Sequence, residues 1–128
     1  MDEAERRKAG RATRSAVLGE AHVARSEAQH NAFKADFVDF LTRYAWGEVW
    51  NRPGLARRER SLITLALLVA GSRWEELPLH LKGALNNGLN VEEIKEVLLH
   101  SAIYAGVPAA NTAFQIAHEV LTKEGKLG

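Results

Sequence analysis

The segment RWEELPLH, residues 73–80, has the spacing that best suits chemistry. Glu76 precedes His80 by four residues, so the two side chains share one face of a helix. A carboxylate at that distance can fix the tautomer of an imidazole and favour its protonated form near neutral pH. Arg73 falls on the same side, two turns before His80, if the helix starts that early. The spacing predicts a proton donor, although a surface ion pair gives the same pattern.

The other histidines point to structural roles. His100 and Tyr104 are also four residues apart, but His100 follows two leucines on a largely apolar helix, which favours a hydrogen-bonded core histidine. His22 and His30 are eight residues apart and could share a helix face. No third ligand accompanies them at metal-binding spacing, so we predict no metal site.

The composition indicates one ordinary globular domain. The chain has 128 residues, 46% of them hydrophobic, which is enough for one core. It has no cysteine, which excludes disulfides, thiolate metal sites and thiol redox chemistry. Its longest apolar run, within residues 62–71, is far shorter than the roughly 20 residues of a membrane span. No apolar segment follows the first charges, so we expect no secretory signal, no membrane partner and a cytoplasmic location.

The charge is small but uneven. The formal net charge is +1, with +4 in residues 1–74 and −3 in residues 75–128. A domain near neutrality lacks the cationic surplus of nucleic-acid binders, so we expect no nucleic-acid partner. Every arginine lies at or before Arg73, and converging guanidinium groups could bind carboxylates of a small molecule. A solvated face or an intersubunit ion pair is the alternative for any one of them.

Apolar residues recur at helical spacing along the whole chain. The pattern predicts an all-α fold, a single domain of about six helices, with no strand and no repeat. A capping box formed by Asn90 and Glu93, a glycine stop at Gly88, a stop at Gly106 and Pro108 in a first turn mark helix boundaries. The six helices are expected at about residues 2–18, 33–44, 56–70, 74–87, 90–105 and 108–125, with a loop at 47–54.

Two helices carry particular burial predictions. The helix at 33–44 has one apolar stripe, which we expect to be buried. The helix at 56–70 is apolar nearly all round after a charged first turn, which predicts full burial by its neighbours or by another subunit, and hence an oligomer. The stripe consists of Phe33, Phe37, Phe40, Leu41 and Tyr44.

Four longer segments follow in order: VLGEAHVAR (17–25), WGEVWNRPGLARRERSLITLALL (46–68), ELPLHLKGALNNGLNVEEIKEVLLH (76–100) and YAGVPAANTAF (104–114). Together they resemble the carboxymuconolactone decarboxylase family over nearly the whole chain. The resemblance implies the helical fold of the alkylhydroperoxidase D-like superfamily in a ring-like homo-oligomer, commonly a hexamer. We expect one domain over residues 1–128, with a helical arm at 1–30 and a helical core at 31–128.

The resemblance also implies a reaction without a cofactor. In the protocatechuate branch of the β-ketoadipate pathway, 4-carboxymuconolactone loses CO2 to give 3-oxoadipate enol-lactone. A sister branch carries C-x-x-C-x-x-x-H, and aligning its histidine on His80 places its cysteines at Arg73 and Glu76 and its upstream glutamate at Ser61. The thiol chemistry of that branch therefore does not transfer, whereas its histidine does.

Roles follow from this implied reaction. The substrate ring can accept the electrons of the broken bond, so the protein supplies carboxylate anchors, oxyanion donors and an acid. His80 is expected to donate the proton, and Glu76 is expected to orient the His80 imidazole. Arg73 is expected to bind a substrate carboxylate or the oxyanion. Weaker candidates for the substrate pocket are Arg52 and Arg60, for the acetate arm, and His22.

Two alternatives stay open. One is a paralogous enzyme on the same scaffold that acts on another lactone or a β-keto acid. The other is a non-enzymatic helical interaction module that docks through its charged N-terminal helix, ERRKAGRATR.

Overall fold

A computed structural model describes all 128 residues of the chain. It contains helices and no strands, which confirms the all-α prediction. There are seven α-helices and one π-helix rather than about six helices, because the short helix α2 was not predicted and the predicted helix at 33–44 comprises α3 and the start of η1. The chain forms two compact units, Met1–Ala56 and Arg57–Gly128. None of the helices combines the length and apolar character that a membrane span requires.

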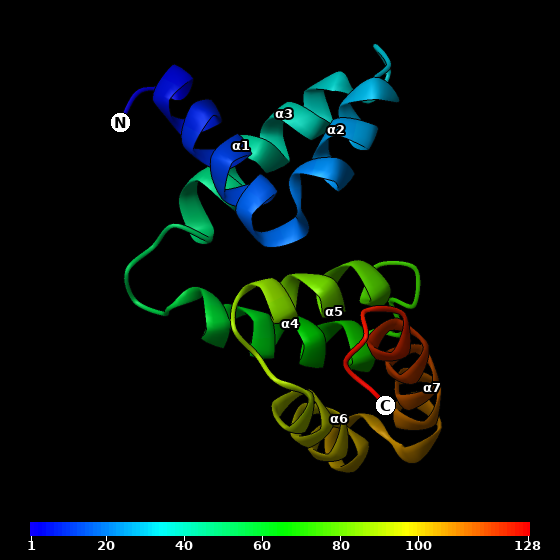
Figure 1. Cartoon of the computed structure of the whole chain (residues 1–128). Coiled ribbons are helices and arrows are strands. Elements are labelled where there is room, and N and C mark those ends of the chain that lie inside the picture. Colours follow the sequence, from blue (N-terminus) through cyan, green and yellow to red (C-terminus); the bar gives the residue numbers. More distant parts are fainter. The chain divides into compact units, whose positions relative to one another are not determined.

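The first unit contains four elements (Figure 1). The side chain of Asp2 caps the first helix, as it accepts a hydrogen bond from the backbone N–H of Glu5 at 2.8 Å. Gly19, with φ of +95°, ends that helix in a conformation that side chains disfavour. The elements are α1 (Glu3–Leu18), α2 (Glu20–Ala28), α3 (Ala35–Leu41) and the π-helix η1 (Thr42–Val49).

Two glycines let α1 and η1 pack closely. A Cβ atom on Gly10 of α1 would lie 1.9 Å from the carbonyl oxygen of Thr42. A Cβ atom on Gly47 of η1 would lie 2.5 Å from the carbonyl oxygen of Arg6. Neither backbone oxygen can move aside like a flexible side chain, so both positions require glycine.

The aromatic stripe of the first unit is exposed, so the prediction that it is buried was wrong. Phe33 is fully exposed, and Phe37 and Phe40 keep 59% and 57% of their surface accessible. α3 has no buried residue, and the close packing of this unit is made by α1 and η1 instead. The predicted helical spacing was correct, but the prediction of which side of the helix packs against the rest of the unit was wrong.

The predicted loop at residues 47–54 begins too early. Helical structure continues through Val49, and the connection occupies residues 50–56. η1 brings the rings of Trp46 and Trp50 into a stack with centroids 5.0 Å apart, and Trp46 is buried. Helical structure thus continues past Gly47, which together with Pro53 and Gly54 had suggested a loop.

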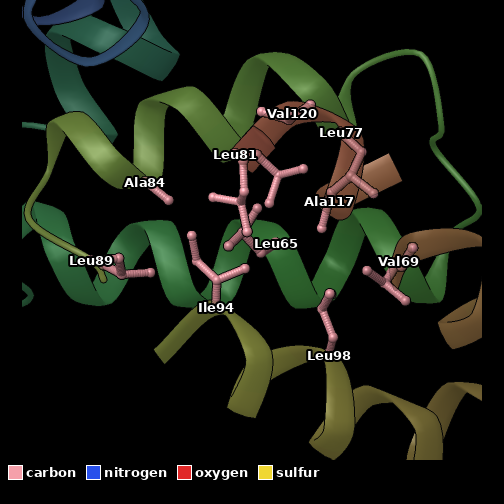
Figure 2. Close-up of a cluster of buried hydrophobic side chains, with 12 residues drawn as sticks. Leu65, Val69, Leu77, Leu81, Ala84, Leu89, Ile94, Leu98, Ala117 and Val120 are labelled. Atoms are coloured by element: carbon pink, nitrogen blue, oxygen red, sulfur yellow. The ribbon is translucent and has the colours of Figure 1, made fainter. Parts of the chain in front are cut away.

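The second unit is built from α4 (Arg57–Ala70), α5 (Leu77–Asn86), α6 (Val91–Ala105) and α7 (Val107–Lys123). Its core lies between all four helices (Figure 2). Fully buried aliphatic side chains at helical spacing contribute one face of each helix. The labelled members are Leu65, Val69, Leu77, Leu81, Ala84, Leu89, Ile94, Leu98, Ala117 and Val120.

α4 is buried on one face only, so its neighbours in the chain do not enclose it, and of the two predicted alternatives burial by another subunit stays open. Ser61, Leu65 and Val69 are buried, whereas Ile63 and Leu67 remain 47% and 65% exposed. The other three helices of this unit meet α4 along its buried face. An apolar outer face is therefore left without cover in the chain.

Helix boundaries in the second unit match the local signals. The Asn90 side chain accepts from the backbone N–H of Glu93, and the Glu93 side chain accepts from the backbone N–H of Asn90. The predicted capping box is thus confirmed. Gly88 and Gly106 have φ of +95° and +104° and end α5 and α6, as expected.

Candidate functional site

His80 lies in the first turn and a half of α5, which starts later than predicted. Pro78 occupies the first turn, where its fixed φ suits a helix and its missing N–H costs nothing. The fully buried Leu77 and Leu81 flank His80 and anchor this end of α5 in the core. His80 itself is half-buried, as expected for a ring beside the anchored face.

Glu76 is the residue immediately before the first residue of α5. The backbone N–H of His80 donates to the carbonyl oxygen of Glu76 at 3.2 Å, so the two residues stand one helical turn apart. The Glu76 side chain is exposed and does not cap the helix. An orienting contact between its carboxylate and the ring of His80 stays a prediction.

Arg73 precedes α5 rather than lying on it. Residues 74–76 form a turn, so the predicted helix start at Trp74 was wrong, and Arg73 is not two helical turns along the same face. Its backbone N–H donates to Leu68 at 2.8 Å, and its carbonyl oxygen accepts from Leu77 at 3.2 Å. These bonds connect the end of α4 to the start of α5. The exposed guanidinium takes part in none of the ion pairs of the second unit.

Arg60 lies in the first turn of α4, which is the end of the α4–α5 pair opposite to the end at which His80 lies. The amide of Asn87 donates to the hydroxyl of Ser61 at 2.8 Å, which places the N-terminal part of α4 beside the end of α5. His80 is seven residues earlier on α5, about 10 Å along the axis. Arg73, Glu76 and His80 are thus neighbours along the chain around the start of α5, whereas the backbone of Arg60 lies near the other end of that helix, and a joint site of their side chains stays a prediction.

The remaining two candidates belong to the first unit. His22 is half-buried in the first turn of α2, and Arg52 is exposed in the connection after η1. His30 lies beyond the end of α2 at Ala28, so it does not share a helix face with His22. No group of three or more histidines, cysteines, aspartates or glutamates is placed to hold a metal ion. A joint site of Arg52 or His22 with the α5 residues stays a prediction.

An open groove of the second unit lies between α4 and α6, away from α5. The groove has a volume of about 640 Å³ and is lined by apolar side chains, by the carboxylates of Glu92, Glu93 and Glu96, and by His100. No guanidinium lines it, and carboxylates repel an anionic ligand. The groove is therefore unsuited to a dicarboxylate, and the α5 segment is the better candidate.

His100 is exposed, so its prediction as a core histidine was wrong. Its ring stacks on that of Tyr104 with centroids 5.2 Å apart, and Tyr104 keeps 82% of its surface accessible. The apolar neighbours of His100 include Leu99, which is itself exposed. In the sequence, the nearly all-round apolar pattern of residues 56–70 was the signal that an exposed apolar surface exists beside His100.

Comparison with known proteins adds the family and its chemistry. A model of the carboxymuconolactone decarboxylase family matches residues 35–119, which contain five of the six candidates, all but His22. A 4-carboxymuconolactone decarboxylase of Acinetobacter baylyi is 49% identical over 98% of this chain and 93% of its own length. A nitrosuccinic acid decarboxylase of Metarhizium robertsii is 40% identical over 84% of this chain and 76% of its own. A 4-carboxymuconolactone decarboxylase sequence of Pseudomonas putida, 48 residues in the match, is 46% identical over 38% of this chain and its own full length.

Proposed function

Because the chain belongs to the carboxymuconolactone decarboxylase family, we propose that it converts 4-carboxymuconolactone to 3-oxoadipate enol-lactone and CO2. The Acinetobacter relative, similar along almost its entire length, supports this substrate. The feature that supports the proposal is the presence of a guanidinium, a carboxylate and an imidazole within residues 73–80, which span the turn before α5 and the first four residues of that helix.

The substrate supplies its own electron sink. Its scissile carboxylate sits on the γ-carbon of the lactone, next to a ring double bond conjugated with the lactone carbonyl. When the C–C bond breaks, CO2 leaves, and the electron pair passes through the double bond to the carbonyl oxygen as a dienolate. A proton then adds to the α-carbon, which moves the double bond and gives the enol-lactone. The reaction consumes one proton and requires neither an oxidant nor a reductant.

His80 is the proposed proton donor, since it is the imidazole in this group. Its half-buried position permits contact with both a bound ligand and solvent, from which it is reprotonated. Glu76, one turn away, is the proposed orienting carboxylate. A positioned acid of this kind accelerates a reaction by about 10²–10⁴.

Arg73 is the proposed anchor for a substrate carboxylate or for the dienolate oxygen. A guanidinium can donate two parallel hydrogen bonds to a carboxylate, and that of Arg73 is exposed. Arg52 and Arg60 are secondary candidates for the acetate arm, and His22 for closing the pocket. The family match crosses from the first unit into the second, which supports one functional domain over residues 1–128.

A second substrate is favoured by one specific relative. Nitrosuccinic acid, named for the Metarhizium protein, carries two carboxyl groups and a nitro group that can accept the electrons of decarboxylation. The same anchors and the same acid would serve both substrates. A paralogous decarboxylase of another activated dicarboxylic acid is therefore the alternative.

The assembly and setting are proposed with the reaction. The uncovered apolar face of α4 supports a homo-oligomer, and the family resemblance suggests a hexamer. A cytoplasmic location fits a metabolic enzyme without cysteines. Light scattering tests the assembly, and a stable monomer of 14.1 kDa would contradict it.

The direct test of the function is an assay with a chelator and no added cofactor. Release of CO2 from 4-carboxymuconolactone, faster than from nitrosuccinic acid, is the expected result. Faster turnover of nitrosuccinic acid would favour the alternative substrate. Loss of activity on addition of the chelator would contradict the proposal of a reaction without a metal.

A further inference from the structure

One arginine of α1 has no carboxylate partner. The other three arginines of this helix, Arg6, Arg7 and Arg11, each form ion pairs with aspartate or glutamate side chains of the first unit. Arg14 instead donates a hydrogen bond of 3.2 Å from a terminal nitrogen to the hydroxyl of Ser26. Because a hydroxyl is neutral, the positive charge of Arg14 is left without a countercharge in contact with it.

The Nε–H group of Arg14 is also unpartnered. This nitrogen is buried and forms no hydrogen bond within the chain. Burial lowers the pKa of the Arg14 guanidinium, whereas hydrogen-bonded carboxylates raise the pKa of Arg6, Arg7 and Arg11. A buried donor without an acceptor costs free energy, and folded proteins rarely retain one. An anion beside Arg14 would supply both the missing acceptor and the missing negative charge.

A cavity of about 430 Å³ adjoins Arg14 in the first unit. Its volume is within the range of sites for small molecules, roughly 300–1,000 Å³. Polar side chains from the end of α2 and from the turn before α3 form much of its wall, and Val38 of α3 contributes an apolar part. The cavity therefore has room for a small ligand beside the unpartnered donor. The polar members of the wall are Ser26, Glu27, Gln29, His30, Asn31 and Lys34.

The charged groups of this wall favour an anion. Lys34 forms none of the ion pairs of the first unit, so its ammonium charge adds to that of Arg14. Glu27 is the one carboxylate of the wall, and both of its oxygens accept hydrogen bonds from Arg11, at 2.9 and 2.8 Å. The negative charge of Glu27 is thus already paired, whereas the two cations are not.

The turn between α2 and α3 holds Lys34 in this wall. The side-chain oxygen of Asn31 accepts a hydrogen bond of 2.9 Å from the backbone N–H of Lys34. Since this oxygen is engaged in the turn, the side-chain NH2 group of Asn31 is the part that can donate to a ligand. The bond to Ser26 restrains the guanidinium of Arg14 in the same way. The site is therefore largely formed before an anion binds, which reduces the entropy that binding costs.

We propose that this cavity binds a small oxyanion, namely inorganic phosphate or the carboxylate of a small organic acid. The Nε–H group of Arg14 donates to one ligand oxygen, and Lys34 supplies a second positive charge. Both ligands present the same chemistry to the guanidinium, because each has two oxygens that can accept its parallel hydrogen bonds. None of the six candidates for the decarboxylase site lines this cavity, so the inference goes beyond the proposed reaction.

Isothermal titration calorimetry with inorganic phosphate and with succinate tests the site, at constant ionic strength balanced by chloride. The wild type is expected to bind at least one of these anions saturably. Arg14→Met, which keeps an unbranched side chain and removes the charge, and Lys34→Met are each expected to weaken binding at least about tenfold. Arg25→Met is the matched control, because Arg25 is exposed on α2 outside the cavity and the same charge is removed. Its affinity is expected to equal that of the wild type.

A second measurement separates ligand binding from a structural role of Arg14. In a buffer that contains chloride and no oxyanion, Arg14→Met is expected to melt no lower than the wild type, because it removes a partly buried cation that lacks a carboxylate partner. Saturating phosphate or succinate is expected to raise the melting temperature of the wild type more than that of Arg14→Met, since a ligand of the folded state stabilises it. The rise in Arg14→Met measures the non-specific effect of the salt.

Tighter binding of phosphate would identify phosphate as the ligand, and tighter binding of succinate would identify an organic acid. Absence of saturable binding of both anions, or equal weakening in Arg14→Met and Arg25→Met, would overturn the proposal. Loss of binding in Arg73→Ala but not in Arg14→Met would also overturn it, because the anion would then occupy the segment proposed for catalysis.

An equal fall of the melting temperature of Arg14→Met in both buffers would likewise overturn the proposal, since it would assign Arg14 a structural role alone. CO2 release is measured separately, so failure of the proposed reaction and failure of this site are distinguishable.

Discussion

The hydroxyl of Ser61 on α4 accepts a hydrogen bond of 2.8 Å from the side-chain amide of Asn87, the residue that follows α5. Ser61 is only 2% exposed, so Asn87 supplies a partner to a polar group that water cannot reach. This bond joins the start of α4 to the end of the helix that carries His80.

Asn87→Ala is expected to destabilise the protein by about 1–3 kcal/mol, because it leaves the buried Ser61 hydroxyl without this donor. Urea unfolding monitored by circular dichroism measures the change. In the double variant with Ser61→Ala, the loss is expected to be smaller than the sum of the two single losses. Additive losses would show that the bond contributes nothing.

Gly10→Ala is expected to destabilise the first unit by about 1–3 kcal/mol or more, since the new methyl group would lie 1.9 Å from the Thr42 carbonyl oxygen. A thermal melt measures the effect. Gly54→Ala is the matched control, because a Cβ atom there meets nothing within 4 Å. Equal melting temperatures for both variants would contradict the close packing of α1 against η1.

The acid stability of the first unit should depend on Glu3. Its hydrogen bond from Arg43 at 2.6 Å, with further bonds from Arg6 and Tyr44, lowers the pKa of the Glu3 carboxyl from 4.5 to about 2. A lowered pKa in the folded state stabilises the protein above pH 4.5, and this contribution is lost as the pH falls from about 4.5 to about 2.

Glu3→Gln is therefore expected to reduce stability at neutral pH and to make the decline between pH 5 and 2 shallower. Denaturant unfolding at a series of pH values measures both effects. Glu5→Gln, an exposed glutamate on the same helix, serves as the control. A pH profile of Glu3→Gln parallel to that of the wild type would contradict the role of this ion-pair network.

Arg73→Ala is expected to lower kcat/KM by about 10–100-fold, as charge-assisted hydrogen bonds contribute about 1.5–3 kcal/mol. Arg73→Lys should recover part of the loss, since an ammonium keeps the charge but not the paired geometry. Steady-state kinetics separate the contributions: a change in KM alone indicates uniform binding, and a change in kcat indicates transition-state contact. Arg25 is an exposed arginine on α2, so Arg25→Ala serves as the control and should not change the kinetics. Unchanged kinetics in Arg73→Ala would exclude Arg73 as an anchor.

Local signals in the sequence predicted most of the fold. The Asn90 and Glu93 capping box and the stops at Gly88 and Gly106 depend on a few neighbouring residues, so they can be read directly. Burial could not be read in this way. The stripe that includes Phe37 has the periodicity of a buried face, but which side of a helix packs depends on distant partners.

The site was predictable in part for the same reason. The order of Arg73, Glu76 and His80 is a local feature that follows directly from the sequence, whereas the arrangement of their side chains as one site stays a prediction. The exact start of the helix depends on the anchoring of Leu77 in the core, which periodicity did not reveal. The position of Arg60 at the far end of α4 required the packing of α4 against α5.

The central claim is that His80 donates the proton that completes decarboxylation, and the rate of CO2 release by His80→Ala tests it most directly. Turnover of 4-carboxymuconolactone is expected to fall by at least about 10². The circular dichroism spectrum and melting temperature should stay close to those of the wild type, because the ring is only half-buried. A folded His80→Ala variant that releases CO2 at the wild-type rate would contradict the account.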